Sequence, residues 1–299
     1  MTRPAFRNCR RGAHLPWLAS MLILIDGSHA LMRAFHALPL LTTSAGEHTG
    51  AIFGVINMLR KITAEHQPEY AAVVFDTPVP TFRDVLYPAY KAQRPEFPVE
   101  LRGQIQPLHA VIQALGLAVV KIPGVEADDV IATLATRAAA TGIPAQIVSG
   151  DKDFAQLVDK NITLRDTMKN LVLDRDGVIA KFGVAPEQMV DYLTLIGDAV
   201  DNIPGVPGVG PKTAVNWLCE YGSLDKLLER AATIKGKVGA NLRANLTQIA
   251  LTRQLITLQR DLDLPITLEN LRVQIPDHVT LKEWFVQLEF HSWLMQLDF

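Results

Sequence analysis

Nine acidic residues form five short clusters, and each cluster lies where a helix or a strand is expected to begin or end. These residues are Asp26, Asp76, Glu126, Asp128, Asp129, Asp151, Asp153, Asp198 and Asp201. Two carboxylates about 4 Å apart repel each other by roughly 4 kcal/mol at an effective dielectric constant near 20, so acids brought together need cations. The donor atoms are all oxygen, with no His or Cys among them, so the pattern predicts a Mg²⁺ site in which Mn²⁺ can substitute.

Each cluster also fits a purely structural role when it is considered alone. Asp26 and Asp76 could be helix N-caps that follow strands, and the acids at 126–129 could interact favourably with a helix dipole. Residues 151–153 could form a turn, and residues 198–201 could cap the hairpin that follows them. Because all five clusters would have to be structural at the same time, we favour the metal site.

Short apolar runs place three of the clusters at the ends of buried strands. In residues 22–28, 71–77 and 145–153 an apolar, β-branched run stops at an acid, as parallel strands do at the carboxyl edge of a sheet. A fourth strand is predicted at 117–123, and helical spacing alternates with the strands at 51–66, 101–116 and 126–142. This alternation predicts an α/β fold with a mostly parallel central sheet and flanking helices on both faces.

The segment at 81–104 interrupts this alternation with interleaved aromatic and basic residues and three prolines. A crossover between strands usually needs only a few loop residues, so an insertion of this length is expected to be functional or mobile. Its composition suits contacts with phosphates and bases, and Phe82 and Arg83 are predicted to contact DNA. The alternative is a surface loop whose aromatic side chains pack on the edge of the sheet.

Helical spacing dominates after residue 181 and predicts a small all-α domain. The helical segments are 186–197, 210–222, 223–234, 241–258 and 281–290. We therefore expect a disordered extension at 1–20, an α/β catalytic domain at 21–191 and a helix-hairpin-helix DNA-binding domain at 192–299. The extension carries four arginines and no clear period, and a nucleic-acid-binding arm is the alternative to disorder.

The helix-hairpin-helix prediction rests on a glycine-rich turn directly after the last acidic cluster. Gly205, Gly208 and Gly210 permit backbone turns that other residues disfavour, and the next residue is a proline, which suits the first turn of a helix. The N–H groups at that helix N-terminus favour a phosphate, and Lys212 and Thr213 lie in its first turn. Such a module holds the DNA backbone without reading the bases.

The overall composition limits the remaining classes of function. The formal net charge is −2, and setting the nine clustered acids aside leaves the rest of the chain net basic. A basic body around an acidic, metal-filled site suits a polyanionic substrate, although an ordinary mixed surface explains the charge equally well. Only Cys9 and Cys219 are present, which argues against a disulfide framework and favours a reducing cytoplasm. No apolar run is long enough to cross a bilayer, so no membrane partner is expected.

Six segments follow one another in a recognisable order. They are LIDGS at 24–28, the Phe-Asp pair at 75–76, YKAQR at 90–94, GVEADDVIATLA at 124–135, SGDKDFAQLV at 149–158 and GDAVDNIPGVPGVGPKTA at 197–214. This set resembles the bacterial 5′-nuclease family, which is flap endonuclease-like, and it is closest to the N-terminal 5′-3′ exonuclease domain of DNA polymerase I. The resemblance extends from Met21 to the C-terminus. It departs from the family pattern in the N-terminal extension and in Ala199 and Val200, which replace a commoner small polar pair.

The resemblance implies a role for each matched residue. The residues implied around a first metal ion are Asp26, Asp76, Glu126, Asp128 and Asp129. The residues implied around a second metal ion are Asp151, Asp153, Asp198 and Asp201. Tyr90, Lys91 and Arg94 would lie at the base of a helical arch formed by the insertion, where Lys91 and Arg94 would stabilise charge on the scissile phosphate. Carbonyl groups of the glycine-rich turn would bind K⁺.

The function implied by the resemblance is that of a magnesium-dependent, structure-specific 5′-3′ exonuclease and 5′-flap endonuclease. It would hydrolyse DNA phosphodiesters in replication and repair, removing primers or flaps. In a two-metal site, ions roughly 3.5 to 4 Å apart activate the attacking water and stabilise the leaving oxygen. The implied partners are DNA with 5′ ends, flaps or nicks, RNA–DNA primers, and a polymerase acting in cis or in trans.

Two other classes of protein remain as alternatives. A non-catalytic binder of DNA junctions could use the same hairpin, but it would not need nine acids that repel phosphate. A metal-dependent phosphatase or ribonuclease could use a similar sheet, but a small or single-stranded substrate needs no grip on a duplex. Cleavage of a labelled 5′-flap DNA, with magnesium and with a chelator, separates the three classes.

Overall fold

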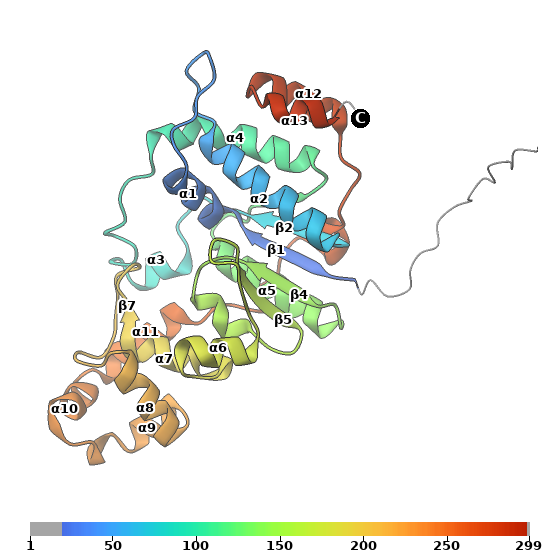
Figure 1. Ribbon diagram of the computed structural model, residues 1–299. Helices are drawn as coiled ribbons and strands as arrows, with labels where there is room; N and C mark the ends of the chain where they lie inside the picture. Colours follow the sequence, from blue (N-terminus) through green and yellow to red (C-terminus); the bar gives the residue numbers. More distant parts are fainter. Residues whose placement is uncertain (1–19, 298–299) are drawn as a thin grey trace, which may run out of the picture.

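A six-stranded sheet forms the centre of the larger part of the molecule (Figure 1). The computed structural model describes residues 20–297, so the predicted extension lies outside the described residues except for its last residue. The strands are β1 (Leu22–Asp26), β2 (Tyr70–Val74), β3 (Ala118–Val120), β4 (Ala145–Val148), β5 (Ile162–Asp166) and β6 (Leu171–Leu173). Their order is β3-β2-β1-β4-β5-β6, and within this sheet only β6 runs antiparallel to its neighbour. The predicted mostly parallel α/β sheet is confirmed.

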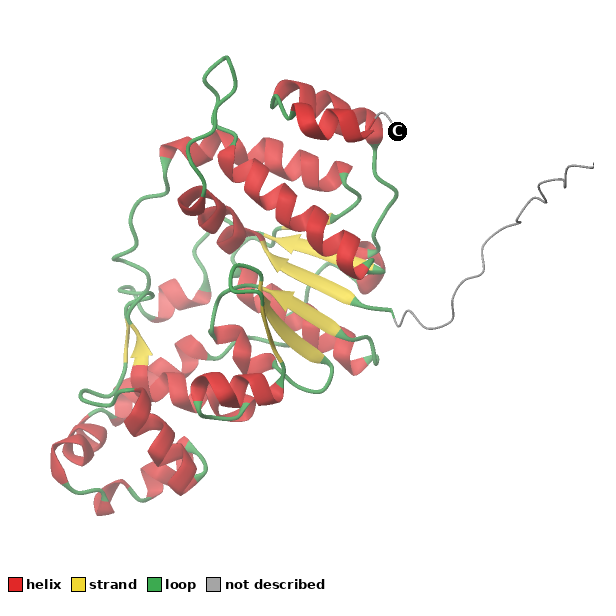
Figure 2. Cartoon of the chain, viewed as in Figure 1, coloured by secondary structure: helices red, strands yellow, loops and turns green. Residues whose placement is uncertain are grey.

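Helices cover both faces of this sheet (Figure 2). One face packs against α1 (Gly27–Ala37), α2 (Gly50–His66), α4 (Val99–Ala114), α12 (His278–Gln287) and α13 (His291–Leu297). The other face packs against α5 (Ala127–Ala140), η1 (Asp153–Leu157) and α6 (Arg175–Phe182), while η2 (Pro186–Gln188) and α7 (Met189–Ile196) pack on η1. Successive residues of β1 point to opposite faces, so Leu22 and Leu24 enter one core and Ile23 and Ile25 enter the other. A strand covered on both sides is apolar throughout, as the sequence of β1 is.

The order of the strands decides which acids become neighbours. Adjacent parallel strands pair in register, with Asp26 at the end of β1 opposite Val74 at the end of β2. The chain leaves β3, β2, β1 and β4 at the same edge of the sheet. Glu126, Asp76, Asp26 and Asp151 therefore follow four adjacent strands in that order.

A two-stranded ribbon, β7 (Gly197–Asp198) with β8 (Ile203–Pro204), connects the sheet domain to a group of short helices. These helices are α8 (Pro211–Tyr221), α9 (Leu224–Glu229), η3 (Ala231–Thr233), α10 (Gly236–Ala244) and α11 (Leu246–Ile256). Gly197 adopts a φ of +73°, and a Cβ atom on Gly205 would lie 2.3 Å from the carbonyl carbon of Ile196. No side chain fits between these backbones, so the ribbon requires glycine at both positions.

The last two helices leave this helical group and pack back on the sheet domain, beyond η4 (Leu268–Leu271). Helices α12 and α13 lie close to α4 and α2 in Figure 1, and Phe285 and Trp293 are buried in the core that α2 and α4 share. The ring of Phe53 in α2 stacks on Trp293, with ring centroids 4.8 Å apart. The end of the segment 192–299, predicted as one domain, therefore lies against the other domain in space.

The insertion after β2 contains one short helix, α3 (Phe82–Leu86), followed by turns at 88–93. The helix begins with a capping box, in which the N–H and hydroxyl of Thr81 donate to Asp84 at 2.7 and 2.9 Å. Lys91 adopts a φ of +54°, and its N–H donates to the carbonyl oxygen of Asp201 at 3.0 Å. This hydrogen bond ties the turn of the insertion to the loop of the β7–β8 ribbon.

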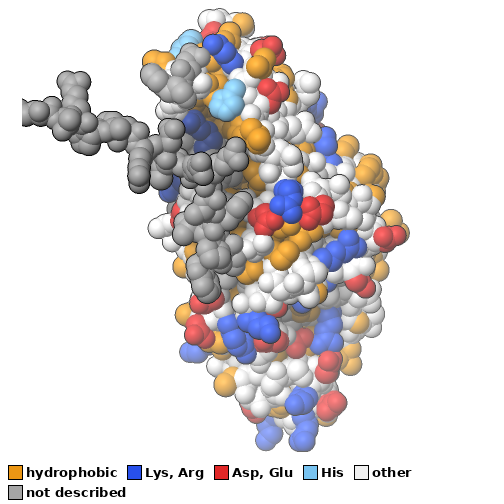
Figure 3. Space-filling model, turned by 90° about the vertical axis from the view of Figure 1, so that its right-hand side faces the viewer, with side chains coloured by type: hydrophobic (Ala, Val, Ile, Leu, Met, Phe, Trp, Pro, Cys, Tyr) orange, Lys and Arg blue, Asp and Glu red, His pale blue; other side chains and the backbone are white. Residues whose placement is uncertain are grey.

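The surface at the other edge of the sheet, where β1 begins, has a mixed character. Lys and Arg side chains are interspersed there with Asp and Glu side chains (Figure 3). The described side chains visible on this face therefore form no extended surface of one sign of charge. Among residues 20–297, no helix is both long enough and apolar enough to span a bilayer.

Candidate functional site

Asp26 is the buried last residue of β1 and the N-cap of α1. Its Oδ1 accepts the N–H of His29 at 2.9 Å, and its Oδ2 accepts the hydroxyl of Ser149 at 3.0 Å. The hydroxyl oxygen of Ser149 in turn accepts the N–H of Asp151 at 3.1 Å. Ser149 therefore connects two acidic clusters. Ser149 was not predicted from the sequence, although its position between an apolar strand and Asp151 could have indicated it.

Asp76 and Asp128 lie at the N-terminus of α5. Asp76 is exposed, its N–H donates to the hydroxyl oxygen of Ser28 at 2.9 Å, and its Oδ1 accepts the N–H of Ala127 at 2.9 Å. Asp128 lies in the first turn of the helix. Both carboxylates thus complement the helix dipole, which is the structural role that was considered for the 126–129 cluster.

Glu126, the residue before α5, lies against three residues of the insertion. Its Oε2 accepts the hydroxyl of Tyr90 and the ammonium of Lys91, each at 3.1 Å, and its Oε1 lies 3.2 Å from the hydroxyl oxygen of Thr81, which donates to the nearer Asp84. Burial and the charge of Glu126 raise the pKa of the Tyr90 phenol, so the phenol keeps its proton. Burial alone would lower the pKa of Lys91, but the charges of Glu126 and Asp201 raise it. The structure thus places Tyr90 and Lys91 beside a predicted metal ligand.

Arg83 and Asp129 form a buried ion pair that corrects the prediction made for Arg83. Their side chains are 2% and 1% exposed, and Nη1 and Nη2 donate to the two carboxylate oxygens at 2.5 and 3.0 Å. Nε donates to the carbonyl of Leu255 at 2.7 Å, and Asp129 also accepts the N–H of Gln259 at 2.9 Å. Arg83 is too deeply enclosed to contact DNA. Both carboxylate oxygens of Asp129 accept hydrogen bonds here, as do those of Asp26, so its role at a metal ion stays a prediction.

The turn after β4 carries the first pair of acids in the second predicted metal group. The N–H of Asp153 donates to Oδ1 of Asp151 at 2.9 Å, which closes the predicted turn. Within the described part of the chain, Oδ1 of Asp153 is buried and has no hydrogen-bond partner. A buried carboxylate oxygen without a donor is costly unless something else binds it.

The other two acids of this group, Asp198 and Asp201, lie on the ribbon and each meets a basic side chain. Nζ of Lys152 lies 2.5 Å from Oδ2 of Asp198, and Nη2 of Arg94 lies 2.5 Å from Oδ1 of Asp201. The hydroxyl of Tyr90 lies 3.5 Å from the other oxygen of Asp201. The ribbon acids are thus held against both the turn after β4 and the insertion.

The clustered acids disfavour one another's negative charge. Burial raises the pKa of Asp26 to about 7, and the charges of Asp76 and Asp151 add to this rise while its own hydrogen bonds oppose it. Burial together with neighbouring acids also raises the pKa of Asp128 and of Asp153 well above the usual range. Such carboxyl groups gain most from a bound cation, because the cation favours their charged form.

The donors therefore fit a hard divalent cation such as Mg²⁺ or Mn²⁺. Among residues 20–297, however, no three His, Cys, Asp or Glu side chains converge as a complete metal-binding group. Lys91, Arg94 and Lys152 already pair with three of the acids. Those carboxylates would have to exchange partners when a cation binds.

The glycine-rich turn joins β8 to α8. Gly208 adopts a φ of +82°, and nothing lies within 4 Å of the position of a Cβ atom on Gly210, the N-cap of α8. Lys212 is exposed in the first turn of this helix and Thr213 is half-buried. The start of α8 is thus open to a ligand, whereas Gly205 serves the close packing of the ribbon.

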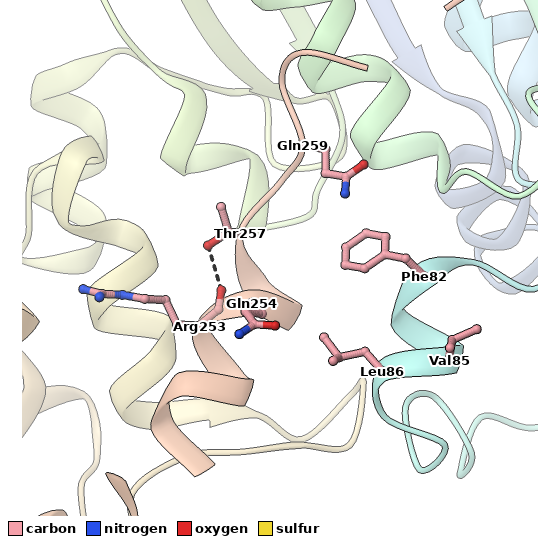
Figure 4. Close-up of a pocket in the computed structure, with 7 residues that line it drawn as sticks. All are labelled: Phe82, Val85, Leu86, Arg253, Gln254, Thr257 and Gln259. Carbon is pink, nitrogen blue, oxygen red and sulfur yellow. Dashed lines mark hydrogen bonds between the residues drawn. The ribbon is translucent and has the colours of Figure 1, made fainter. Parts of the chain in front are cut away.

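Phe82 points into an open cavity between α3 and the end of α11 (Figure 4). The cavity has a volume of about 900 Å³ and is lined by Phe82, Val85, Leu86, Arg253, Gln254, Thr257 and Gln259. The charged end of Arg253 is directed away from Phe82 and pairs with Asp191 and Asp225. None of the clustered acids lines this cavity. Phe82 is thus not brought to the acidic site, and its contact with DNA stays a prediction.

Two family models match most of the chain. Residues 21–183 match the N-terminal resolvase-like domain of 5′-3′ exonucleases, and residues 184–279 match the C-terminal SAM fold of 5′-3′ exonucleases. The chain belongs to the 5′-3′ exonuclease family. The resemblance seen in the acidic and glycine-rich segments is confirmed, and these segments are features of a nuclease.

Curated relatives agree with this family. The chain is 50% identical over 286 residues to DNA polymerase I of Pseudomonas aeruginosa, covering 92% of this chain and 31% of that protein. It is 40% identical over 277 residues to a 5′-3′ exonuclease of Aquifex aeolicus, covering 93% of this chain and 95% of that protein. The chain therefore spans about a third of the length of the polymerase relative and nearly all of the exonuclease relative.

Solved structures show the same fold. The T5 5′-exonuclease with bound zinc ions superposes with a TM-score of 0.69 at 20% identity, covering 80% of this chain and 89% of that chain. The catalytic core of Rad2 in complex with a DNA substrate superposes with a TM-score of 0.60 at 16% identity, covering 96% of this chain and 95% of that chain. The predicted sheet domain followed by a helical domain is thus a known arrangement.

Proposed function

We propose that this chain is a magnesium-dependent, structure-specific nuclease that acts on DNA as a 5′-3′ exonuclease and a 5′-flap endonuclease. The observation that carries the proposal is the row of Glu126, Asp76, Asp26 and Asp151 after four adjacent strands of one sheet. Ligands bind at this edge of a parallel sheet. The membership of the chain in the 5′-3′ exonuclease family gives the row its chemistry.

Two divalent cations would be held by the nine clustered acids. The first group is Asp26, Asp76, Glu126, Asp128 and Asp129, and the second group is Asp151, Asp153, Asp198 and Asp201. When bound, the cations supply an activated water and stabilise charge at the leaving oxygen. The raised pKa of Asp26 and the unpartnered buried oxygen of Asp153 support such cations.

Lys91 and Arg94 stabilise negative charge on the scissile phosphate in this proposal. Each of these basic side chains pairs with one carboxylate in the structure: Lys91 with Glu126 and Arg94 with Asp201. A phosphate that arrives there offers both side chains a second anionic partner at short range. Tyr90 keeps its proton and orients Glu126 through its hydroxyl.

The glycine-rich turn and the first turn of α8 hold the duplex part of the substrate. The open N-terminus of α8 at Gly210 and the exposed Lys212 suit a phosphate of the DNA backbone. Gly208 and Thr213 complete this contact, and carbonyl groups of the turn would bind K⁺. Contacts of this kind fix the position of the duplex and are independent of base sequence.

The proposed substrates are DNA with free 5′ ends, flaps or nicks, and RNA–DNA primers, in replication and repair. The comparisons that support them are a T5 flap endonuclease solved with DNA and metal ions and Rad2 solved with DNA. The relatives named DNA polymerase I support a polymerase that acts in cis or in trans.

The test is cleavage of a 5′-flap DNA labelled at its 5′ end, with millimolar Mg²⁺ and with a chelator. We expect cleavage near the junction of duplex and single strand with Mg²⁺ and none with the chelator. The control substrate is a DNA with the same junction of duplex and single strand but without a free 5′ end. Binding without any cleavage in Mg²⁺ or Mn²⁺ would favour the non-catalytic junction binder instead.

A further inference from the structure

Lys152 lies between Asp151 and Asp153 in the turn after β4, and its side chain reaches Asp198 on the ribbon. Its Nζ lies 2.5 Å from Oδ2 of Asp198, whose Oδ1 accepts the N–H of Val200 at 2.9 Å. The Asp198 side chain is 10% exposed and that of Lys152 is 33% exposed. This ion pair spans the sheet domain and the β7–β8 ribbon.

The backbone around Lys152 keeps its ammonium close to the acids. The N–H of Asp153 donates to Asp151 at 2.9 Å, and the carbonyl of Lys152 accepts the N–H of Ala155 at 3.0 Å. Both bonds hold the turn that carries Lys152.

Lys152 differs from the two basic residues of the insertion in its place in the chain. Lys91 and Arg94 lie on turns of the insertion and pair with Glu126 and Asp201. Lys152 is part of the short turn that also supplies Asp151 and Asp153. A divalent cation bound by Asp151, Asp153 and Asp198 would therefore lie near the ammonium of Lys152, and the two positive charges would compete for the same carboxylates.

We propose that Lys152 is a positioning residue that holds Asp198 and limits the affinity of the second divalent cation by its positive charge. This inference rests on the proposed two-cation nuclease. Removal of the ammonium has two opposite effects on that cation. The loss of a like charge strengthens cation binding. The loss of a partly exposed ion pair weakens the positioning of Asp198 only slightly, so the first effect dominates.

The experiment is a titration of the full chain with Mn²⁺ in the absence of DNA, in which free Mn²⁺ is measured by electron paramagnetic resonance. The variants are Lys152→Gln, which can still donate a hydrogen bond to Asp198, Lys152→Met, and Lys152→Arg, which keeps the charge. The control is Lys160→Met, which removes the same charge from an exposed residue on the turn before β5. Thermal unfolding of each variant is followed in parallel.

We expect the weaker Mn²⁺ site to bind about tenfold more tightly in Lys152→Gln and Lys152→Met, which corresponds to about 1.4 kcal/mol. Lys152→Arg and Lys160→Met should match the wild type. Unchanged or weaker Mn²⁺ binding in a folded Lys152→Gln protein would overturn the inference and leave the proposed nuclease intact. A wild-type chain that binds no Mn²⁺ would overturn both.

Discussion

Arg83 and Asp129 face each other through two parallel hydrogen bonds of 2.5 and 3.0 Å, inside the protein, between α3 and the first turn of α5. Arg83 also donates to the carbonyls of Leu255 and Thr257 at the end of α11 and just after it. The pair thus joins the insertion, the sheet domain and the helical domain. An acid that is predicted as a metal ligand from the sequence also holds the fold together through this pair.

Asp129→Ala should destabilise the protein by about 3–5 kcal/mol, because it leaves the guanidinium of Arg83 buried without its partner. Urea unfolding at neutral pH measures this loss. The double variant Arg83→Met with Asp129→Leu should recover much of it, since no unpaired charge remains. An Asp129→Ala protein with wild-type stability and weakened Mn²⁺ binding would show that Asp129 serves the metal site and not the fold.

Asp151→Asn should reduce cleavage and leave stability nearly unchanged. Asparagine keeps the oxygen that accepts the N–H of Asp153, so stability and affinity for flap DNA should stay near those of the wild type. Cleavage should fall by about 10² or more, which is the size of a lost electrostatic group at a reacting centre. Full turnover by the folded variant at millimolar Mg²⁺ would remove Asp151 from the proposed ligands.

Lys91→Ala should reduce single-turnover cleavage by about 10² to 10³, while substrate affinity changes far less, if the ammonium acts mainly in the transition state. Arg94→Ala should show the same pattern. Rapid-quench kinetics at saturating flap DNA separates the two effects. Weak binding combined with normal cleavage at saturation would make the insertion a binding segment and leave catalysis to the acids and their cations.

Gly205→Ala and Gly210→Ala should differ, although both glycines belong to the predicted hairpin. A Cβ atom at Gly205 meets the backbone of Ile196 at 2.3 Å, so the substitution should cost about 1–3 kcal/mol or more. Gly210 has open space around this position, so its substitution should cost less than about 1 kcal/mol. Thermal unfolding compares the two. Equal losses of stability in the two variants would show that the ribbon does not require a residue without a side chain at position 205.

Lys212→Ala should weaken the binding of duplex-containing substrates and reduce the salt slope of binding by about one unit, because one phosphate contact is lost. The effect should not depend on base sequence. Fluorescence anisotropy over a range of KCl concentrations measures it. The control is Lys160→Ala. Lys160 is exposed just before β5, at the edge of the sheet away from the acids, so this variant should bind DNA like the wild type. If the two variants bind alike, Lys212 does not contact the duplex.

Local patterns in the sequence predicted β1 to β4 and several of the helices, but they did not predict β5 or β6. The apolar run that ends at Asp26 predicts a buried strand because a strand covered on both faces has no polar side. The glycine-rich turn before Lys212 predicts a backbone suited to phosphate because its φ angles and free N–H groups are local properties. Both predictions depend only on residues that are close together in the chain.

Only the tertiary structure decided which distant residues meet. The sequence placed Asp129 among the other acids, but its partner Arg83 is 46 residues away and is brought to it by the packing of α3 on α5. Ser149 reaches Asp26 because β4 pairs with β1, and strand order is not a property of any single strand. Whether a carboxylate faces a metal ion, a serine or a buried guanidinium depends on such pairings, and these follow from how the whole core packs.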